Sequence, residues 1–232
     1  MKIAILSDIH ANIYAFNAVL DVIKKEGIEK IIVAGDLIGY YYWPREVIDI
    51  CMRNDDILCI KGNHEKNFMM ALSDPECMSA AIEKYGTSYR IASETLSQDQ
   101  IKWLDSLPYV LDINLDNRTF YVTHGSLESI DEYIYPDESR DTLLNQMSDS
   151  DYTILGHTHY PFICSNNDKW LINPGSVGQP RDYCASASFF IVNLKTNMVI
   201  PKRVKFQIED ILKHVDLHDQ HLTYLKTVLI RT

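Results

Sequence analysis

The chain has 232 residues, of which 46% are hydrophobic and 23% are charged, and its formal net charge is −10 at pH 7. This length and composition predict a globular protein with one well-buried core, which we expect to form a single domain over residues 1–232. The negative charge argues against stable binding to nucleic acid or to an anionic membrane, because both need a positive protein surface.

The five cysteines are scattered, odd in number, and never spaced as C-x-x-C. Such thiols are typical of a reducing compartment and disfavour both a disulfide framework and a thiolate zinc site. The apolar run at residues 1–6 is too short for a signal peptide. No stretch approaches the roughly 20 apolar residues of a membrane-spanning helix. We therefore expect a cytoplasmic protein with no membrane contact.

The first part of the chain predicts successive strand-loop-helix units. Apolar runs at residues 2–6, 30–34 and 57–60 indicate strands, and helical periodicity follows at about 13–23 and 44–53. Repeated units of this kind predict parallel strands buried between layers of helices. In such sheets the ligand site lies beyond the carboxyl ends of the strands, where the polar loops of this chain begin.

Strand signals disappear between Lys66 and Pro108 and helical periodicity replaces them. Apolar positions predict helices over 68–72 and 78–91, and a further helix is indicated by a capping-box pattern, Ser97-x-x-Gln100. We interpret the segment at about 66–108 as a helical insertion beside the site. Whether it also shapes a substrate pocket stays open at this point.

Alternating patterns return after Pro108 and predict a second set of strands. A hairpin is expected around the turn Asp116-Asn117, and an amphipathic helix is expected from about Ile208. The remaining expected elements are a helix near 141–147, a strand at 152–155, and two hairpins that pair 162–165 with 170–172 and 186–194 with 198–206.

Polar side chains follow five of the predicted strands at the point where each strand ends, and five of the eight histidines lie in these loops. A lone histidine at a strand end is usually a packing residue, but five beside carboxylates and an amide are hard to explain by packing. Imidazole, carboxylate and amide ligands without thiolate suit manganese, iron or zinc. Because these groups exceed what one ion needs, we predict a dinuclear centre. They are Asp8, His10, Asp36, Asn63, His64, His124, His157 and His159.

The motifs D-x-H, G-D-x-x-G, G-N-H-E, H-G, G-H-T-H and N-P-G-S-V-G-Q-P-R occur in this order from the first strand to Arg181. In this respect the chain resembles the calcineurin-like metallophosphoesterases. The resemblance is strongest to a small bacterial and archaeal branch related to diadenosine tetraphosphatases and serine/threonine phosphatases. It implies an α/β fold of four layers, a metallophosphoesterase sandwich of the order α/β/β/α with a helical insertion.

The resemblance also implies a role for each loop residue. Asp36 would bridge two metal ions, most naturally manganese, iron or both, with zinc and nickel as alternatives. His64 would lie outside the coordination sphere and protonate the leaving oxygen as general acid. Arg181 would contact the substrate phosphate, although a surface arginine after a proline turn is an equal alternative. The other ligands are Asp8, His10 and His159 for the first ion, and Asn63, His124 and His157 for the second.

These residues predict a metal-dependent phosphoric ester hydrolase in which metal-bridging hydroxide attacks a small phosphomonoester, phosphodiester or nucleotide. Within enzymes, a dinucleoside polyphosphate hydrolase and a protein phosphatase remain alternatives. The rival from another class is a non-catalytic protein-interaction scaffold of the same fold. Whether the chain forms homo-oligomers stays open.

Several features depart from the motif pattern or have two interpretations. Ala11 stands where the first motif often has glycine. The aromatic run Tyr40-Tyr41-Tyr42-Trp43 either stacks on a nucleobase or packs under the helical insertion. Gly62 favours a tight turn with positive φ, and Glu65 favours a supporting or helix-capping role. Three histidines near the C-terminus, at 214, 218 and 221, either bind a metal or form a solvated stripe.

Overall fold

The computed structural model describes residues 1–231. Its first sheet begins with three parallel strands, β1 (Lys2–Leu6), β2 (Lys30–Val33) and β3 (Ile57–Cys59). Two antiparallel strands, β9 (Ala187–Asn193) and β10 (Met198–Val204), complete it in the order β10-β9-β1-β2-β3. The carboxyl ends of β1, β2 and β3 therefore meet at one edge of the sheet.

The second sheet has the order β4-β5-β6-β8-β7. Its central strands β5, β6 and β8 run parallel, and β4 and β7 pair antiparallel at its two sides. The strands are β4 (Val110–Leu115), β5 (Arg118–Thr123), β6 (Tyr152–Ile154), β7 (Phe162–Asn166) and β8 (Lys169–Asn173). Both expected hairpins of this region are present.

The two sheets pack face to face, and this corrects the expectation of helices on both sides of β1–β3. Alternate residues of β1 explain the arrangement, since side chains along a strand point to opposite faces. Ile3 and Ile5 enter a core with Phe120 of the second sheet, whereas Ala4 and Leu6 enter a core with the helices. The four-layer α/β/β/α order that the motifs implied is the order observed.

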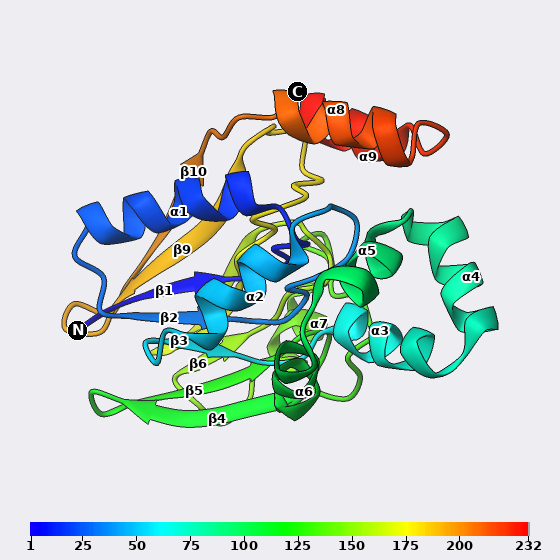
Figure 1. Cartoon of the computed structure of the whole chain (residues 1–232). Coiled ribbons are helices and arrows are strands. Elements are labelled where there is room, and N and C mark those ends of the chain that lie inside the picture. The colour runs from blue at the N-terminus through cyan, green and yellow to red at the C-terminus, as the bar shows by residue number, and fades with distance from the viewer. Residues whose placement is uncertain (232) are drawn as a thin grey trace.

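Helices cover the outer face of each sheet (Figure 1). On the first sheet lie α1 (Ile13–Lys25) and α2 (Pro44–Met52), with Phe16 of α1 fully buried in the core. On the second sheet, α7 (Arg140–Asn145) places Leu143 in a smaller apolar cluster with Phe162. No helix within residues 1–231 combines the length and the apolar character needed to cross a membrane.

The segment between β3 and β4 folds as four helices: α3 (Asn63–Ser73), α4 (Pro75–Tyr85), α5 (Ser88–Thr95) and α6 (Gln98–Ser106). In Figure 1, α3, α4 and α5 lie at the right of the view and α6 lies at the lower centre. The helix expected over 78–91 is interrupted, because Gly86 has φ of +82° and ends α4. The expected capping box at the start of α6 is present, with reciprocal bonds between Ser97 and Gln100.

The C-terminal region forms two helices where one was expected, α8 (Glu209–His218) and α9 (Tyr224–Ile230). The chain turns at Asp219, whose buried carboxylate accepts hydrogen bonds from the Thr87 backbone and hydroxyl groups and from the Tyr42 hydroxyl at 2.9–3.0 Å. This carboxylate joins the C-terminal helices, the helical insertion and the loop before α2. Local helical periodicity gave no sign of a turn fixed by such distant partners.

Candidate metal centre

The loops after β1, β2, β3, β5 and β6 converge beyond the edge of the sheets. They bring together all seven side chains that the sequence singled out as metal ligands, and each of these is 6% exposed or less. Their donor atoms form two clusters, and Asp36 belongs to one and lies close to the other. The seven residues are Asp8, His10, Asp36, Asn63, His124, His157 and His159.

The first cluster contains Asp8, His10 and His159. The two histidines place their Nε2 atoms 3.0 Å apart. Asp8 Oδ1 lies 3.6 Å from His10 Nε2 and 3.2 Å from His159 Nε2. Three donor atoms thus face one small volume.

The second cluster contains Asp36, His124 and His157. His124 Nε2 lies 3.2 Å from Asp36 Oδ2 and 3.0 Å from Asn63 Oδ1. The same Asp36 Oδ2 lies 3.8 Å from His10 Nε2 of the first cluster. Asp36 is therefore positioned between the clusters, where one carboxylate can serve both.

Backbone carbonyl groups orient three of the histidines. The Nδ1 atoms of His10, His124 and His159 lie 3.1, 2.6 and 2.7 Å from the carbonyl oxygens of Ile38, Ala34 and Gln179, respectively. An Nδ1–H that donates to a carbonyl leaves the Nε2 lone pair free, which is the usual arrangement of metal-binding histidines. The lone pairs of these rings point into the clusters.

Two buried acceptors in the clusters lack a hydrogen-bond partner, as expected of a site that binds cations. Asp8 Oδ1 and His157 Nε2 have no hydrogen-bond partner within residues 1–231, and such unpaired buried groups are costly unless something compensates them. Burial acts to lower the pKa of His124, but the Asp36 charge raises it to about 10. Burial instead lowers the pKa of His157, and it lowers that of His159 to about 3. The imidazole and carboxylate donors of the clusters fit two first-row metal ions.

His64 lies beside the first cluster, as the second residue of α3. Its ring centroid is 4.9 Å from that of His10, and a ring nitrogen lies within 4.8 Å of the His10 and Asp36 donor atoms. Its Nδ1 is 2.9 Å from the hydroxyl of Tyr89, so this nitrogen points away from the clusters. Burial lowers the pKa of His64 well below its usual value.

Glu65 holds two of the site loops together. Its fully buried carboxylate accepts from the backbone N–H groups of Asp36 and Gly62 through Oε2, and from those of Leu37 and Ile38 through Oε1, at 2.7–3.2 Å. The bond from Gly62 also satisfies the backbone N–H of the N-cap residue of α3, which is the half of a capping box that a glycine allows. Burial and the charge of Asp36 raise the pKa of Glu65 to about 7, although the backbone N–H donors act to lower it.

Gly62 is required for a reason other than the positive φ that the sequence suggested. Its φ is −99° and its ψ is −170°, which is extended backbone that any residue adopts. A Cβ at this position would instead lie 2.1 Å from Asp36 Oδ1. The glycine therefore permits close approach of the β3 loop to the carboxylate between the two clusters.

Left-handed backbone is concentrated in the loops that carry the donor atoms. Asp8, His10, Asp36, His157 and His159 all have φ between 52° and 67°. This conformation is costly for residues with a Cβ and persists only where surrounding structure enforces it. Hydrogen bonds between the loops, such as those from Asp8 N to Gly35 O and from His10 N to Asp36 O, provide that support.

Residues 1–197 match the model of the calcineurin-like phosphoesterase superfamily domain. The chain belongs to this superfamily. The metallophosphoesterase motifs that the sequence displayed therefore reflect common ancestry, and the two clusters lie where those motifs converge. The matched segment ends before β10 and the C-terminal helices.

Three other proteins resemble the chain over most of its length. It is 33% identical over 225 residues to the uncharacterized protein MJ0912 of Methanocaldococcus jannaschii, covering 89% of this chain and 88% of that protein. A metallophosphoesterase structure from Sphaerobacter thermophilus is 28% identical, covers 97% of this chain and 99% of its own, and has a TM-score of 0.79. The fold of the hypothetical protein PH1004 from Pyrococcus horikoshii is also similar, with a TM-score of 0.82, 23% identity, and coverage of 98% and 97%.

A cavity of about 50 Å³ adjoins the two clusters. Tyr40, Tyr85 and Tyr133 form part of its wall, and the Tyr133 ring stacks on His157 with centroids 3.9 Å apart. The sequence analysis missed Tyr85, Tyr89 and Tyr133. Tyr85 and Tyr89 are spaced as i and i+4, a pattern that indicated only helix packing, and no motif marks Tyr133.

Arg181 also lines this cavity and is held in place by neutral partners. Its Nη2 donates to the Tyr40 hydroxyl at 3.0 Å and to Gln179 Oε1 at 2.8 Å. No carboxylate forms an ion pair with Arg181 among residues 1–231. Its charge is thus available to an anion in the cavity.

Most of the aromatic run packs inside the protein, and only Tyr40 reaches the cavity. Tyr41 and Tyr42 are buried against the C-terminal helices, in a cluster with Val215 and Leu225. His214 and His218 stack on Tyr42, with centroids 5.9 and 5.1 Å away. The solvated-stripe interpretation was therefore wrong for these two histidines, while His221 lies beyond the end of α8 and is exposed.

Proposed function

We propose that the chain is a dinuclear metal-dependent phosphoesterase that hydrolyses a small phosphomonoester, phosphodiester or nucleotide. The observation that carries the proposal is the position of Asp36 between two clusters of inward-facing donor atoms. Asp8, His10 and His159 would hold one ion, and the other ligands, Asn63, His124 and His157, would hold the second. Asp36 would be shared. A pair of ions supplies a water activated for attack and charge that stabilises the phosphoryl oxygens.

His64 is the residue that would move a proton. Its Nδ1 is engaged by Tyr89, which leaves Nε2 as the nitrogen that can deliver a proton to the leaving oxygen. Burial lowers the pKa of His64, and an anionic phosphoryl group beside the ring would raise it. Substrate binding would therefore prepare the general acid.

Arg181 would bind the phosphoryl group from the wall of the metal-ligand cavity. A guanidinium group presents several N–H donors in a plane, which suits two phosphate oxygens at once. Tyr40 fixes the guanidinium by accepting one of its N–H groups. The tyrosine rings around the cavity limit access of bulk water, which strengthens these charge interactions.

Two substitutions test the proposal by separating proton transfer from metal binding. Purified protein is reconstituted with manganese, iron, zinc or nickel, and hydrolysis of p-nitrophenyl phosphate and bis(p-nitrophenyl) phosphate is measured together with metal content. His64→Ala should keep its metal and lose about 10²- to 10⁴-fold in turnover. Asp36→Ala should lose both metal and turnover, and His221→Ala, at an exposed position, should lose neither.

Two results would contradict the proposal. If the wild-type protein hydrolysed neither ester with any of the four metals, a non-catalytic scaffold would be the better interpretation. If His64→Ala lost as much metal as Asp36→Ala, His64 would be a ligand and not the general acid.

A further inference from the structure

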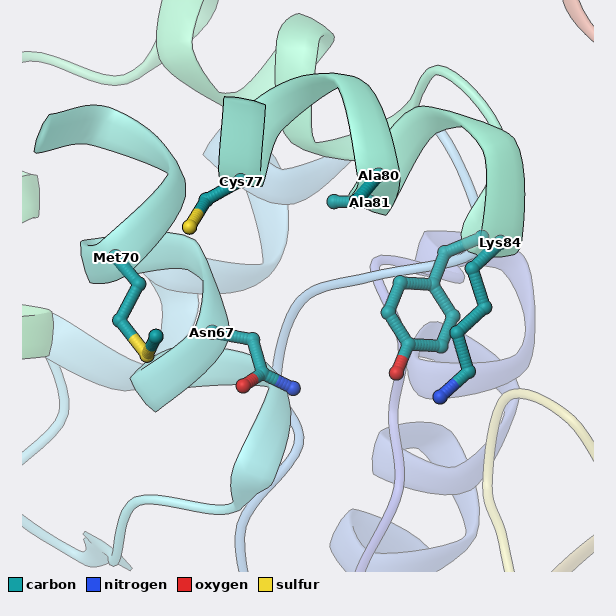
Figure 2. A pocket seen from close by; sticks show the side chains of 7 residues that line it. Asn67, Met70, Cys77, Ala80, Ala81 and Lys84 are labelled. Carbon is teal, nitrogen blue, oxygen red and sulfur yellow. The ribbon is translucent and has the colours of Figure 1, made fainter. Parts of the chain in front are cut away.

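A second cavity, of about 280 Å³, lies between α3 and α4 beside the metal-ligand cavity. We name it the α3–α4 pocket, and Figure 2 shows its lining. Lys84 and Tyr85 line both cavities, and the Tyr85 ring lies 4.6 Å from that of His64. The pocket is therefore adjacent to the place where the reacting phosphoryl group would lie.

The size of the metal-ligand cavity limits what it can hold. Its volume of about 50 Å³ is far below the range for small-molecule sites, which is roughly 300–1,000 Å³. A phosphoryl group at the ions would fill it, and the rest of a substrate would have to lie outside. The α3–α4 pocket is the adjoining space, and its volume is near the lower end of the range for small-molecule sites, roughly 300–1,000 Å³.

The wall of the α3–α4 pocket combines apolar surface with one amide. Met70, Cys77, Ala80 and Ala81 supply small or polarizable side chains that suit the face of a planar ring. Asn67 follows the metal-site residue Asn63 by one helical turn, so both project from the same side of α3.

The Asn67 carboxamide supplies the polar recognition. It makes no hydrogen bond to a side chain or backbone group within residues 1–231 and extends into the space between the helices (Figure 2). A carboxamide offers one acceptor and two donors, a combination that matches the donor and acceptor edge of a nucleobase. A sugar alone would need more polar partners than this wall provides, and an alkyl chain would leave the amide unpaired.

Cationic groups lie where the phosphate of such a ligand would be. Lys84 stands between the two cavities, with its Nζ 4.9 Å from the Tyr85 ring centroid, and Arg181 lies across the metal-ligand cavity. The two charges complement a phosphoryl group at the ions with a base in the α3–α4 pocket.

We propose that the α3–α4 pocket binds the leaving group of the substrate and that this group is a nucleoside, an inference that rests on the phosphoesterase function proposed above. In the step, the oxygen of water forms a bond to phosphorus while the bond from phosphorus to the nucleoside oxygen breaks. His64 supplies the proton that converts the leaving oxygen to a hydroxyl, and a proton from the attacking water restores His64. The products are a free nucleoside and a phosphate, or a phosphomonoester when the substrate is a diester.

Paired substrates isolate the contribution of the base. Adenosine 5′-monophosphate and ribose 5-phosphate have the same leaving oxygen and differ only in the base, and their methyl diesters provide the same comparison for a diesterase. The metal-loaded wild-type protein should show a kcat/KM at least about 10-fold higher for the nucleoside member of the hydrolysed pair. Equal values for the two members would overturn the proposal.

A matched pair of variants tests whether the preference for the nucleoside substrate depends on the α3–α4 pocket. Ala80→Trp fills the α3–α4 pocket, whereas Ser79→Trp adds the same ring at the neighbouring exposed position outside it. Ala80→Trp should reduce the nucleoside preference about 10-fold and Ser79→Trp should preserve it. Asn67→Ala should also reduce it, chiefly through KM, since the amide contacts a part of the substrate remote from the reacting bond. The same preference in both tryptophan variants would contradict the assignment.

A binding measurement distinguishes failure of this inference from failure of the proposed function. Calorimetric titration with adenosine 5′-monophosphate does not depend on turnover. In one outcome, p-nitrophenyl phosphate is not hydrolysed, the nucleotide binds the wild type and Ser79→Trp, and it binds Ala80→Trp about 10-fold more weakly. The pocket assignment then stands and the enzymatic proposal fails. If the esters are hydrolysed but the nucleotide binds all three proteins equally, the pocket assignment fails alone.

Discussion

The Tyr89 hydroxyl lies 2.9 Å from Nδ1 of His64 and donates a hydrogen bond to the His64 carbonyl oxygen at 3.1 Å. Because the single hydroxyl proton goes to the carbonyl, Nδ1 must be the nitrogen that donates to the tyrosine oxygen. Tyr89, which belongs to the helical insertion, therefore sets both the orientation and the tautomer of the proposed general acid.

We expect Tyr89→Phe to lower kcat by about 5- to 10-fold, the effect of losing one neutral hydrogen bond. Metal content should not change, because Tyr89 contacts none of the ligands, and the ring should keep its packing against Phe68. Steady-state kinetics with p-nitrophenyl phosphate and metal analysis measure both quantities. Tyr109→Phe, at an exposed tyrosine, is the control, and equal kinetics for the two variants would remove Tyr89 from the mechanism.

Glu65→Gln should destabilise the protein by about 3 kcal/mol and weaken metal retention. A glutamine has one acceptor oxygen, so its NH₂ group would face two of the four backbone donors that the carboxylate now satisfies, and unpaired buried donors are costly. Urea unfolding and metal analysis test this expectation. Glu83→Gln on the exposed side of α4 should change neither, and an unaltered Glu65→Gln protein would show that the loop needs no carboxylate.

Ala11→Gly should stabilise the protein by about 0.5–1 kcal/mol. Ala11 has φ of 52°, and relief of its left-handed strain, about 1–2 kcal/mol, exceeds the entropic cost of glycine. The same substitution at Ala18, inside α1, should instead destabilise by about 1 kcal/mol. Thermal unfolding of both variants provides the comparison, and a loss of stability in both would refute the role of backbone strain at Ala11.

His214 should make stability depend on pH through the C-terminal helices. Burial and the neighbouring His218 lower the pKa of His214, while Asp210 acts to raise it. Because its folded pKa lies below its unfolded value, the stabilising contribution is fully present above pH 6.5 and is lost as the pH falls below that value.

The wild type should therefore lose more unfolding free energy between pH 7.5 and pH 5 than His214→Phe, which keeps a ring against Tyr42 but cannot titrate. Chemical denaturation at the two pH values measures the difference. His221→Phe, at an exposed position, should keep the wild-type pH dependence. Identical pH dependence in the wild type and His214→Phe would exclude this contribution.

Sequence reasoning succeeded where the determining signals are local. Apolar runs that stop at polar residues located the strands, and the placement of Asp8, Asp36 and His124 at strand ends follows directly from those runs. Ser97 and Gln100 identified the start of a helix, because a capping box is complete within four residues.

It failed where the cause is distant in the chain. Nothing beside β1 indicates that Ile3 and Ile5 face a second sheet, since a strand covered by helices has the same apolar pattern. Gly62 appeared to favour a turn, but its constraint comes from Asp36 in the loop after β2. The positions of Tyr85, Tyr89 and Tyr133 depend on how the insertion and the β5–α7 loop fold over the site.

The C-terminal helices predict which sequence features should occur together in related proteins of this superfamily. They lie beyond the matched residues 1–197, yet they cover Tyr41 and Tyr42. The Tyr41 hydroxyl also donates to the Leu225 carbonyl oxygen. A relative that ends before these helices would expose both rings to water. The aromatic run and the C-terminal helices should therefore be gained and lost together. Members that lack these helices should have smaller or more polar residues after the second motif than members that have them.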